Sequence, residues 1–237
     1  PRTVSSAASD VYKRQILGEV TAQFLSYQGH KIIREYYVND AGRQIDLLLV
    51  SVLLCHLGKN KHIFVDEKSS DDGHLVTYKG NYVNDVAKSL SHDLEKIDKD
   101  YVLSLLNQPI DSLISFLKKH KSYSEIRNAL VNVIIDEYIK EDLSVVGINF
   151  DSWFRESQLY ETGLLDEVLL NIKNKNLSYS KDGALWFKNT QFGDDQDRVL
   201  IKKNGDMTYF ATDIAYHVHK FKNHDVLIDI WGADHHD

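Results

Sequence analysis

Towards its C-terminal end the chain has several strand-like apolar segments, and each of them stops at acidic, glycine or histidine residues. The segments cover residues 184–190, 198–209 and 226–231, and the last leads into Gly232-Ala233-Asp234-His235-His236. In an α/β protein, polar ligands bind beyond the carboxyl ends of the strands. The pattern therefore predicts an α/β fold with a polar ligand site, and it favours an enzyme over a scaffold.

The first part of the chain alternates between helical and extended patterns. Apolar residues three and four apart predict a helix over 16–28 that ends at Gly29. A strand is predicted over 31–38, followed by a turn and a second helix over 43–57. Helix, strand and helix in succession favour a nucleotide-binding type of sheet.

The last part of the chain returns to the same alternation. Residues 198–209 fold back around the turn at 203–206, as in a hairpin. Helical spacing follows over 213–221, and the run at 226–231 is continuous enough to form a central parallel strand.

Between about residues 80 and 180 the chain becomes charged and rich in Leu and Ile. Its periodicity predicts helices over 84–106, 110–120 and 123–142. An extended piece over 150–155 and a helix over 159–173 follow. This change in composition and periodicity indicates a helical module inserted into the α/β pattern.

Composition excludes several classes of protein. A chain of 237 residues, 43% of them hydrophobic, buries the core of one large domain or two smaller ones. The net charge of −7 argues against a general polyanion-binding surface, although a local basic groove stays open. Because Cys55 is the single cysteine, no internal disulfide forms and a reducing cytoplasm is expected. No apolar stretch is long enough to cross a bilayer, so we expect a soluble protein without a membrane partner.

Tyr209 and Asp213 lie one helical turn apart after the predicted hairpin, so both side chains can face one pocket. A carboxylate holds a guanidinium through paired hydrogen bonds while an aromatic ring covers its flat face. The pair therefore suits a planar cationic ligand. The alternative is structural: Thr212 or Asp213 caps the helix, and Tyr209 packs in the core.

Gly232, Asp234, His235 and His236 follow the last predicted strand. At such a position the backbone can approach a nucleotide and a carboxylate can bind ribose hydroxyls. A metal site with His217 and His219 added has suitable donors but no recognised ligand spacing. A plain polar loop is the other alternative.

Two other polar segments carry weaker signals. Asn39, Asp40 and Gly42 end the first predicted strand in the equivalent way, with ordinary turn chemistry as the alternative. The acidic run at 193–198 lacks the alternating ligands of a calcium loop, and we assign it no catalytic role. Neither Gly-x-x-x-x-Gly-Lys nor Gly-x-Gly-x-x-Gly occurs in the sequence.

Together these blocks resemble the arginyl-tRNA synthetases, which are class I aminoacyl-tRNA synthetases. The resemblance runs from about Ile16 to the end, in matching order and separation, and it is loose only in the helical middle. The matching stretches are Ile16-Leu17-Gly18-Glu19, residues 29–42 (GHKIIREYYVNDAG), 182–198 (DGALWFKNTQFGDDQDR) and 209–236, which end in IDIWGADHH.

The resemblance implies a Rossmann-type parallel-sheet catalytic domain that is interrupted by a helical connective insertion and is incomplete at both ends. Residues 16–80 and 181–237 would form its two parts, and 81–180 the insertion. Residues 1–15 match nothing in the family, and we expect them to be disordered or foreign to the fold.

The resemblance also implies a two-step reaction. The carboxylate of L-arginine attacks the α-phosphate of ATP, which gives arginyl-adenylate and pyrophosphate. The arginyl group then passes to a hydroxyl of the terminal adenosine of tRNA(Arg). Such chemistry depends on positioning and charge stabilisation, with Mg²⁺ on the nucleotide and neither a protein-bound metal nor a protein nucleophile. We expect a monomer in the cytoplasm.

The site residues of the family fall on specific positions. Its arginine-specificity tyrosine and aspartate match Tyr209 and Asp213, and its Gly-x-Asp element near the adenosine matches Gly232 and Asp234. The remaining matches are His235 and His236 in the adenosine string, and Asn39, Asp40 and Gly42 at the cleft rim.

The sequence also departs from the family. Members carry a His-x-Gly-His signature just before the helix that begins near Ile16, preceded by an acid and an asparagine that help to bind arginine, and residues 1–15 contain none of these. The family's lysine-containing loop and anticodon-binding domain lie beyond Asp237. We therefore expect an internal fragment that by itself neither activates arginine nor charges tRNA.

Three rival functions stay open. The first is another class I synthetase, such as the one for cysteine, although Tyr209 with Asp213 favours a guanidinium ligand. The second is a non-catalytic binding module derived from a synthetase. The third is a metal-dependent hydrolase that uses Asp234, His235 and His236.

Overall fold

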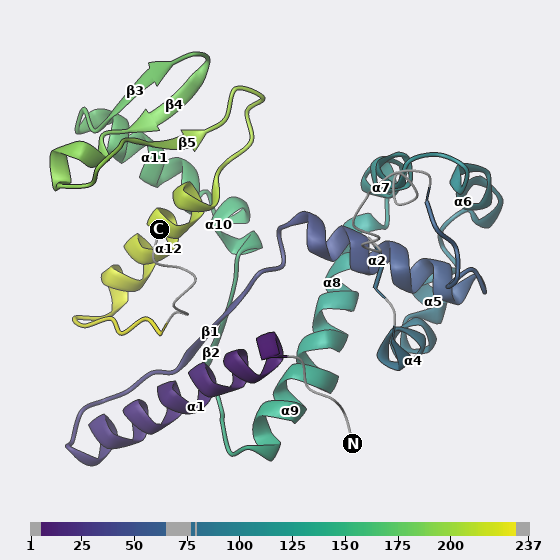
Figure 1. Ribbon diagram of the computed structural model, residues 1–237, viewed down its shortest axis with the longest axis horizontal. Coiled ribbons are helices and arrows are strands. Elements are labelled where there is room, and N and C mark those ends of the chain that lie inside the picture. The colour runs from purple at the N-terminus through teal and green to yellow at the C-terminus, as the bar shows by residue number, and fades with distance from the viewer. Residues whose placement is uncertain (1–5, 65–76, 79, 231–237) are drawn as a thin grey trace. The chain divides into compact units, whose positions relative to one another are not determined.

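The computed structural model describes residues 6–64, 77–78 and 80–230 (Figure 1). The chain divides into two compact units, of which one comprises Pro1–Asn39 with Phe150–Asp237 and the other Asp40–Asn149. We call them the α/β unit and the helical unit. The helical unit, residues 40–149, does not coincide with the predicted insertion at 81–180. It starts earlier because the helix at 43–56, which follows the first strand, packs with the helices after it. The assignment of catalytic domain and insertion by residue stays a prediction.

Helix α1 spans Ser6–Tyr27 in the α/β unit. The expectation of disorder before Ile16 is therefore wrong from Ser6 onwards, and residues 1–5 lie outside the described part. The stretch after Ser6 contains Ala, Lys, Arg and Gln and no Gly or Pro before Gly18, so nothing in it stops a helix. As predicted, Gly29 follows its end, with a left-handed φ of 91° and a bond from its N–H to the carbonyl of Ser26.

A parallel strand pair follows α1 and confirms the predicted α/β class. Strand β1, Glu35–Val38, pairs with β2, Ser152–Arg155, in a register that runs from Glu35↔Ser152 to Val38↔Arg155. The first strand is shorter than the predicted 31–38. The whole helical unit lies between these strands in the sequence, so it forms the connection between two parallel neighbours.

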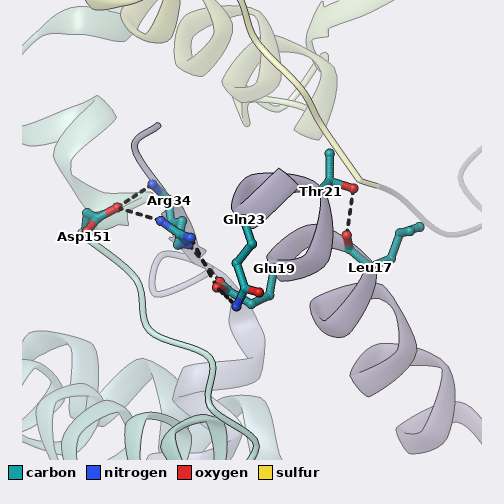
Figure 2. Close-up of polar contacts among 6 residues, drawn as sticks. All are labelled: Leu17, Glu19, Thr21, Gln23, Arg34 and Asp151. Carbon is teal, nitrogen blue, oxygen red and sulfur yellow. Dashed lines mark hydrogen bonds and ion pairs between the residues drawn. The ribbon is translucent and has the colours of Figure 1, made fainter. Parts of the chain in front are cut away.

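Arg34 ties α1 to this strand pair (Figure 2). Its Nε and Nη2 donate to the two carboxylate oxygens of Glu19, at 2.8 and 3.1 Å, and its backbone N–H donates to Asp151 at 2.8 Å. Burial opposes ionisation of Glu19, yet hydrogen bonds from Arg34 and Gln23 hold the pKa of its carboxyl below the usual value. The forked pair fixes both the distance and the orientation of the helix.

Helix α2, Arg43–His56, is the centre of the helical unit and confirms the predicted helix over 43–57. Every residue from Asp46 to Leu54 is buried, as in a helix that is surrounded by others. The predicted helix over 84–106 is interrupted after Ser89 and after Leu94, and Asp98, whose side chain accepts the backbone N–H of Tyr101, starts a new helix. Helices α4, α5, α7 and α8 contact α2. The helices of this unit after α2 are α4 (Asn81–Ser89), α5 (Ser91–Leu94), α6 (Lys99–Leu105), α7 (Ile110–Lys119), α8 (Tyr123–Ile134), the π-helical η1 (Ile135–Ile139) and α9 (Lys140–Val145).

The rest of the α/β unit holds an antiparallel sheet of three strands with helices on one side of it, as Figure 1 shows. The sheet core contains Leu185, Phe187, Leu200 and Ile201, which pack with residues of α11 and α12. Gly163, with a left-handed φ of 73°, divides the predicted helix over 159–173. The elements are α10 (Ser157–Glu161), α11 (Leu164–Asn174), β3 (Ser178–Lys181), β4 (Ala184–Phe187), the 3₁₀ turn η2 (Asn189–Phe192), β5 (Arg198–Ile201) and α12 (Tyr209–Asn223).

Two turns shape this sheet. The turn at 203–206 is confirmed, because the N–H of Lys202 donates to the carbonyl of Asp206 at 2.8 Å. The second turn was missed, and strand β3 with it. Asp182 and Gly183 have positive φ of 54° and 80°, as the tight turn of a hairpin requires, and the Asp-Gly pair is the sequence signal that could have revealed it.

The prediction of a strand over 226–231 is wrong for residues 226–230, and Trp231 lies outside the described part. In the described ranges these residues pair with no other strand, and Val226 and Ile228 are 75% and 57% exposed. A parallel strand forms only beside a partner. The segment is held instead by Asp229, which contacts Lys220 and His217 of α12. None of the described helices is both long enough and apolar enough to span a bilayer.

Candidate functional site

The start of α12 is fixed to the sheet by Thr208. Its hydroxyl donates to the carbonyl of Val199 at 2.7 Å and accepts the N–H of Ala211 at 3.3 Å, as an N-cap residue does. Its own N–H donates to the carbonyl of Leu200 at 3.0 Å. The first turn of the helix therefore has a defined position over the end of β5.

Tyr209 and Asp213 project from this first turn. Tyr209 is 70% exposed and Asp213 is exposed, whereas Ala211 and Thr212 between them are buried. The structural alternative for the pair is wrong on both counts: the cap is Thr208, and Tyr209 does not pack in the core. Both side chains are thus accessible on one face of α12.

Tyr37 and Glu156 belong to the carboxyl ends of β1 and β2. The backbone N–H of Glu156 donates to the carbonyl of Val38 at 3.0 Å, and the Glu156 side chain is buried at 4% exposure. Burial raises the pKa of Tyr37, and the negative charges of Glu156 and Asp213 raise it further. The neutral Tyr37 hydroxyl therefore donates a hydrogen bond to Glu156.

Tyr160 of α10 completes the group. Burial raises the pKa of its hydroxyl, with added contributions from Glu156 and Tyr209. Asp213 acts on Tyr37 in the same way. Helix α10 contacts both β2 and α12, so these residues lie around one acidic, aromatic patch, which we call the tyrosine–carboxylate site (Tyr37, Glu156, Tyr160, Tyr209 and Asp213).

An aromatic layer supports this site from below. The ring centroid of Tyr37 lies 4.8 Å from that of Tyr216 and 6.2 Å from that of Phe154. The hydroxyl of Tyr216 donates to Glu35 at 2.7 Å, and that of Ser152 donates to the other carboxylate oxygen at 2.8 Å. Burial and the bond to Glu35 raise the pKa of Tyr216, so it stays a neutral donor. Packed rings with satisfied hydroxyls make a rigid floor.

Two carboxylates and three tyrosines define what the tyrosine–carboxylate site can do. The carboxylates accept hydrogen bonds from a cation, and tyrosine rings attract one through their faces. A planar guanidinium uses both properties at once, whereas an ammonium is a point charge. The geometry therefore suits recognition of a guanidinium.

The residues predicted for a cleft rim lie on both sides of the unit boundary. Asn39 is exposed directly after β1, and Asp40 is fully buried, with its carbonyl accepting Arg127 Nη2 within the helical unit. Gly42 precedes α2 in an extended conformation with φ of −80°, which any residue can adopt. The adenosine string, Gly232, Asp234, His235 and His236, lies outside the described residues.

The histidines considered for a metal site have other partners. His217 Nδ1 lies 2.8 Å from the carbonyl of Asp213, and its Nε2 lies 3.2 Å from Asp229. The His219 ring packs against Phe154. Within the described ranges, no three His, Cys, Asp or Glu side chains gather as metal ligands would.

Sequence reasoning missed Tyr37, Glu156 and Tyr160. Glu156 directly follows the extended piece predicted over 150–155, so the rule that polar residues at strand ends form sites would have selected it. Tyr37 and Tyr160 gave no comparable signal, because aromatic residues in strands and helices usually pack in cores.

Known proteins are similar to this chain in sequence and in fold. Residues 11–231 match the model of the catalytic domain of class I tRNA synthetases (R). The arginine–tRNA ligase of Hydrogenovibrio crunogenus is 38% identical over 242 residues, which cover 92% of this chain and 40% of that protein. That of Aquifex aeolicus is 36% identical over 239 residues, with 93% and 40% covered. The chain thus spans about 40% of the length of these curated relatives.

Solved structures agree with this family. An arginyl-tRNA synthetase structure from Campylobacter jejuni is 30% identical with a TM-score of 0.70, covering 94% of this chain and 43% of that one. The Thermus thermophilus enzyme, at 24% identity and a TM-score of 0.51, shares the fold over 83% of this chain and 30% of its own. The family model separates this chain from the synthetase for cysteine. Sequence and fold together show that the chain belongs to the class I arginyl-tRNA synthetases and represents part of their catalytic domain.

Proposed function

We propose that this chain supplies the arginine-binding part of an enzyme that activates L-arginine with ATP and transfers it to tRNA(Arg). The observation that carries the proposal is the tyrosine–carboxylate site, in which the exposed pair Tyr209 and Asp213 lies near Tyr160 and Tyr37, and these two tyrosines neighbour the buried Glu156. Family membership supplies the reaction: arginine–tRNA ligases are ATP-dependent ligases.

In this proposal Asp213 binds the guanidinium directly. Its exposed carboxylate accepts paired N–H bonds, and the Tyr209 ring covers one face of the ligand. Glu156 adds negative potential from below and orients the Tyr37 hydroxyl through its hydrogen bond. Lysine would leave part of this acceptor set unmatched, which is a basis for selectivity.

The nucleotide side of the site is proposed from the sequence match alone. Gly232 and Asp234 would approach the adenosine, together with His235 and His236, and Asn39, Asp40 and Gly42 would lie at the rim. Mg²⁺ would accompany the ATP phosphates and shield their charge during attack by the arginine carboxylate. A monomer in the cytoplasm, with a helical connective insertion between two parts of the catalytic domain, completes the proposal.

Calorimetric titration of the purified chain with L-arginine and L-citrulline tests the arginine site. Citrulline has nearly the same shape without the positive charge. We expect arginine to bind, citrulline to bind at least about tenfold more weakly, and Asp213→Asn to lose the difference, since a hydrogen bond to a charged group contributes about 1.5–3 kcal/mol. Asp206→Asn, in an exposed hairpin turn, is the matched control.

Equal binding of arginine and citrulline by a folded chain would remove the guanidinium assignment. Arginine-dependent pyrophosphate exchange tests the chemistry separately. We expect no exchange by the chain alone, because His-x-Gly-His occurs nowhere in its 237 residues. Robust pyrophosphate exchange would show that other residues of the chain bind the ATP phosphates.

A further inference from the structure

Glu35 lies next to the floor of the tyrosine–carboxylate site, and the proposed binding of arginine does not use it. It is the first residue of β1, two residues before Tyr37. Successive side chains of a strand point to opposite faces, so Glu35 and Tyr37 lie on the same face of the strand pair. In the register of the pair, Glu35 lies opposite Ser152 and Tyr37 opposite Phe154. The Glu35 carboxylate is thus on the side of the floor away from the carboxyl ends of the strands.

The Glu35 carboxylate joins three elements. One of its oxygens accepts the hydroxyl of Tyr216 from α12 at 2.7 Å, and the other accepts the hydroxyl of Ser152 from β2 at 2.8 Å. Glu35 is half-buried, and Tyr216 is buried. Hydrogen bonds to a carboxylate are stronger than those between neutral groups. Glu35 therefore ties β1 to both β2 and α12.

Tyr216 carries this connection to the first turn of α12. It follows Tyr209 by seven residues and Asp213 by three, and these spacings place the three side chains on one face of the helix. A shift of α12 by one residue would turn that face by about 100° and move it by about 1.5 Å. Whatever fixes the Tyr216 hydroxyl therefore also fixes the direction in which Tyr209 and Asp213 point.

Ring packing also joins α12 to the strand pair, but it sets the helix position less sharply. The ring centroid of Tyr216 lies 4.8 Å from those of Tyr37 and Phe154, and the Phe154 ring also packs against His219. Burial of apolar surface is non-directional, so it resists separation of α12 from the strands and permits sliding or turning. The bond from Tyr216 to Glu35 requires a defined distance and angle. It can therefore hold α12 in one register.

We propose that Glu35 is a positioning residue for recognition of the guanidinium: through Tyr216 it sets the position of α12, and α12 in turn holds Asp213 at the site. In this role Glu35 acts through the helix and does not bind the ligand itself. The inference rests on the proposed function, because it concerns the geometry of the arginine site. It makes selectivity for arginine depend on a carboxylate outside the group of residues that bind the ligand.

Calorimetric titration of the whole chain with L-arginine and L-citrulline tests this role. We expect Glu35→Ala and Tyr216→Phe each to weaken arginine binding about tenfold and citrulline binding by less, since loss of a contact that orients a binding residue costs about 10–100-fold at metal sites. Both changes break the same bond, so the double variant should bind no more weakly than either single one. Glu35→Gln can still accept the Tyr216 hydroxyl, so it should stay close to the parent chain.

Tyr78→Phe is the matched control, because it removes a tyrosine hydroxyl that is bound to Gln44 at 2.7 Å in the helical unit. Hydrogen exchange followed by mass spectrometry measures the position of α12 without arginine. We expect the backbone amides over 209–216 to exchange faster in Glu35→Ala and Tyr216→Phe than in the parent chain, and at the parent rate in Tyr78→Phe.

Three results would overturn the proposal: equal exchange over 209–216 in folded Glu35→Ala and the parent chain, additive losses of arginine affinity in the double variant, or a loss in Tyr78→Phe as large as that in Tyr216→Phe. Equal weakening by Glu35→Gln and Glu35→Ala would assign the effect to the charge of Glu35 and would also refute a positioning role. The exchange measurement separates this inference from the proposed function. A parent chain that does not distinguish arginine from citrulline refutes the arginine site, while exchange over 209–216 still decides whether Glu35 positions α12.

Discussion

Substitution of Thr208 by Ala tests how α12 is anchored above the sheet. The hydroxyl accepts the N–H of Ala211, a capping bond whose loss costs about 1 kcal/mol, and donates to the carbonyl of Val199, a bond that contributes about 1 kcal/mol. The backbone bonds of residue 208 remain in the variant. We therefore expect Thr208→Ala to lower the free energy of unfolding by about 2 kcal/mol.

Urea unfolding followed by tryptophan fluorescence measures this loss, because Trp153 and Trp186 both belong to the α/β unit that carries the substitution. With a slope of about 2 kcal/mol/M, the midpoint should fall by about 1 M. Thr208→Ser keeps the hydroxyl and should stay within about 0.5 kcal/mol of the parent chain. If the Ala and Ser variants unfold at the same urea concentration, the hydroxyl does not anchor the helix and the reasoning fails.

Two further predictions concern buried and partly buried carboxylates. Asp46 is buried beside Lys118 and accepts a hydrogen bond from Tyr123, so we expect Asp46→Ala to destabilise the helical unit by about 3 kcal/mol in a urea titration followed by circular dichroism. Asp85→Ala removes a carboxylate from an exposed ion pair and should change the free energy of unfolding by less than about 0.5 kcal/mol. Equal losses in the two variants would contradict a stabilising role of the buried Asp46 carboxylate. Burial opposes ionisation of Asp229, but hydrogen bonds and charge from Lys220, and then from His217, hold the pKa of its carboxyl below the usual value. The ionised carboxylate therefore stabilises the folded state fully above about pH 4, and this stabilisation is lost as the pH falls through the lower pKa of the folded state. Acid unfolding should therefore show a shallower pH dependence below about pH 4 in Asp229→Asn, and an unchanged profile would exclude this role.

The elements that the sequence predicted best are those whose causes are local. Helix α2 was expected over 43–57 and spans Arg43–His56, because its apolar run and its flanking turn lie within the helix itself. The turn at 203–206 also formed as expected. Gly, Asn and Asp at a turn act through their own backbone preferences, which no distant contact needs to support.

The errors arise where distant residues decide. The run at 226–230 has the composition of a buried strand, but a strand needs a partner that composition does not supply. The helix predicted over 84–106 is interrupted after Ser89 and after Leu94, and Asp98 starts a separate helix through a capping bond that competes with continuation. Periodicity reports which face is apolar and is silent about such competition.

The candidate site shows the same division. Tyr209 and Asp213 lie on one helical turn, so their proximity follows from the helix repeat. Their meeting with Tyr37 and Glu156 depends on the parallel register of β1 and β2, which joins segments far apart in the sequence. A single sequence contains no direct record of that register.

The parallel pairing of β1 and β2 has a consequence for protein engineering. The chain leaves β1 at its carboxyl end and must re-enter β2 at its amino end, so any link must travel back along the strands by about 13 Å. Excision of the helical unit would therefore need a replacement crossover of about a dozen residues, wound in the right-handed sense. A tight two-residue link would instead force a hairpin, reverse β2, and move Glu156 to the end of the pair remote from Tyr37.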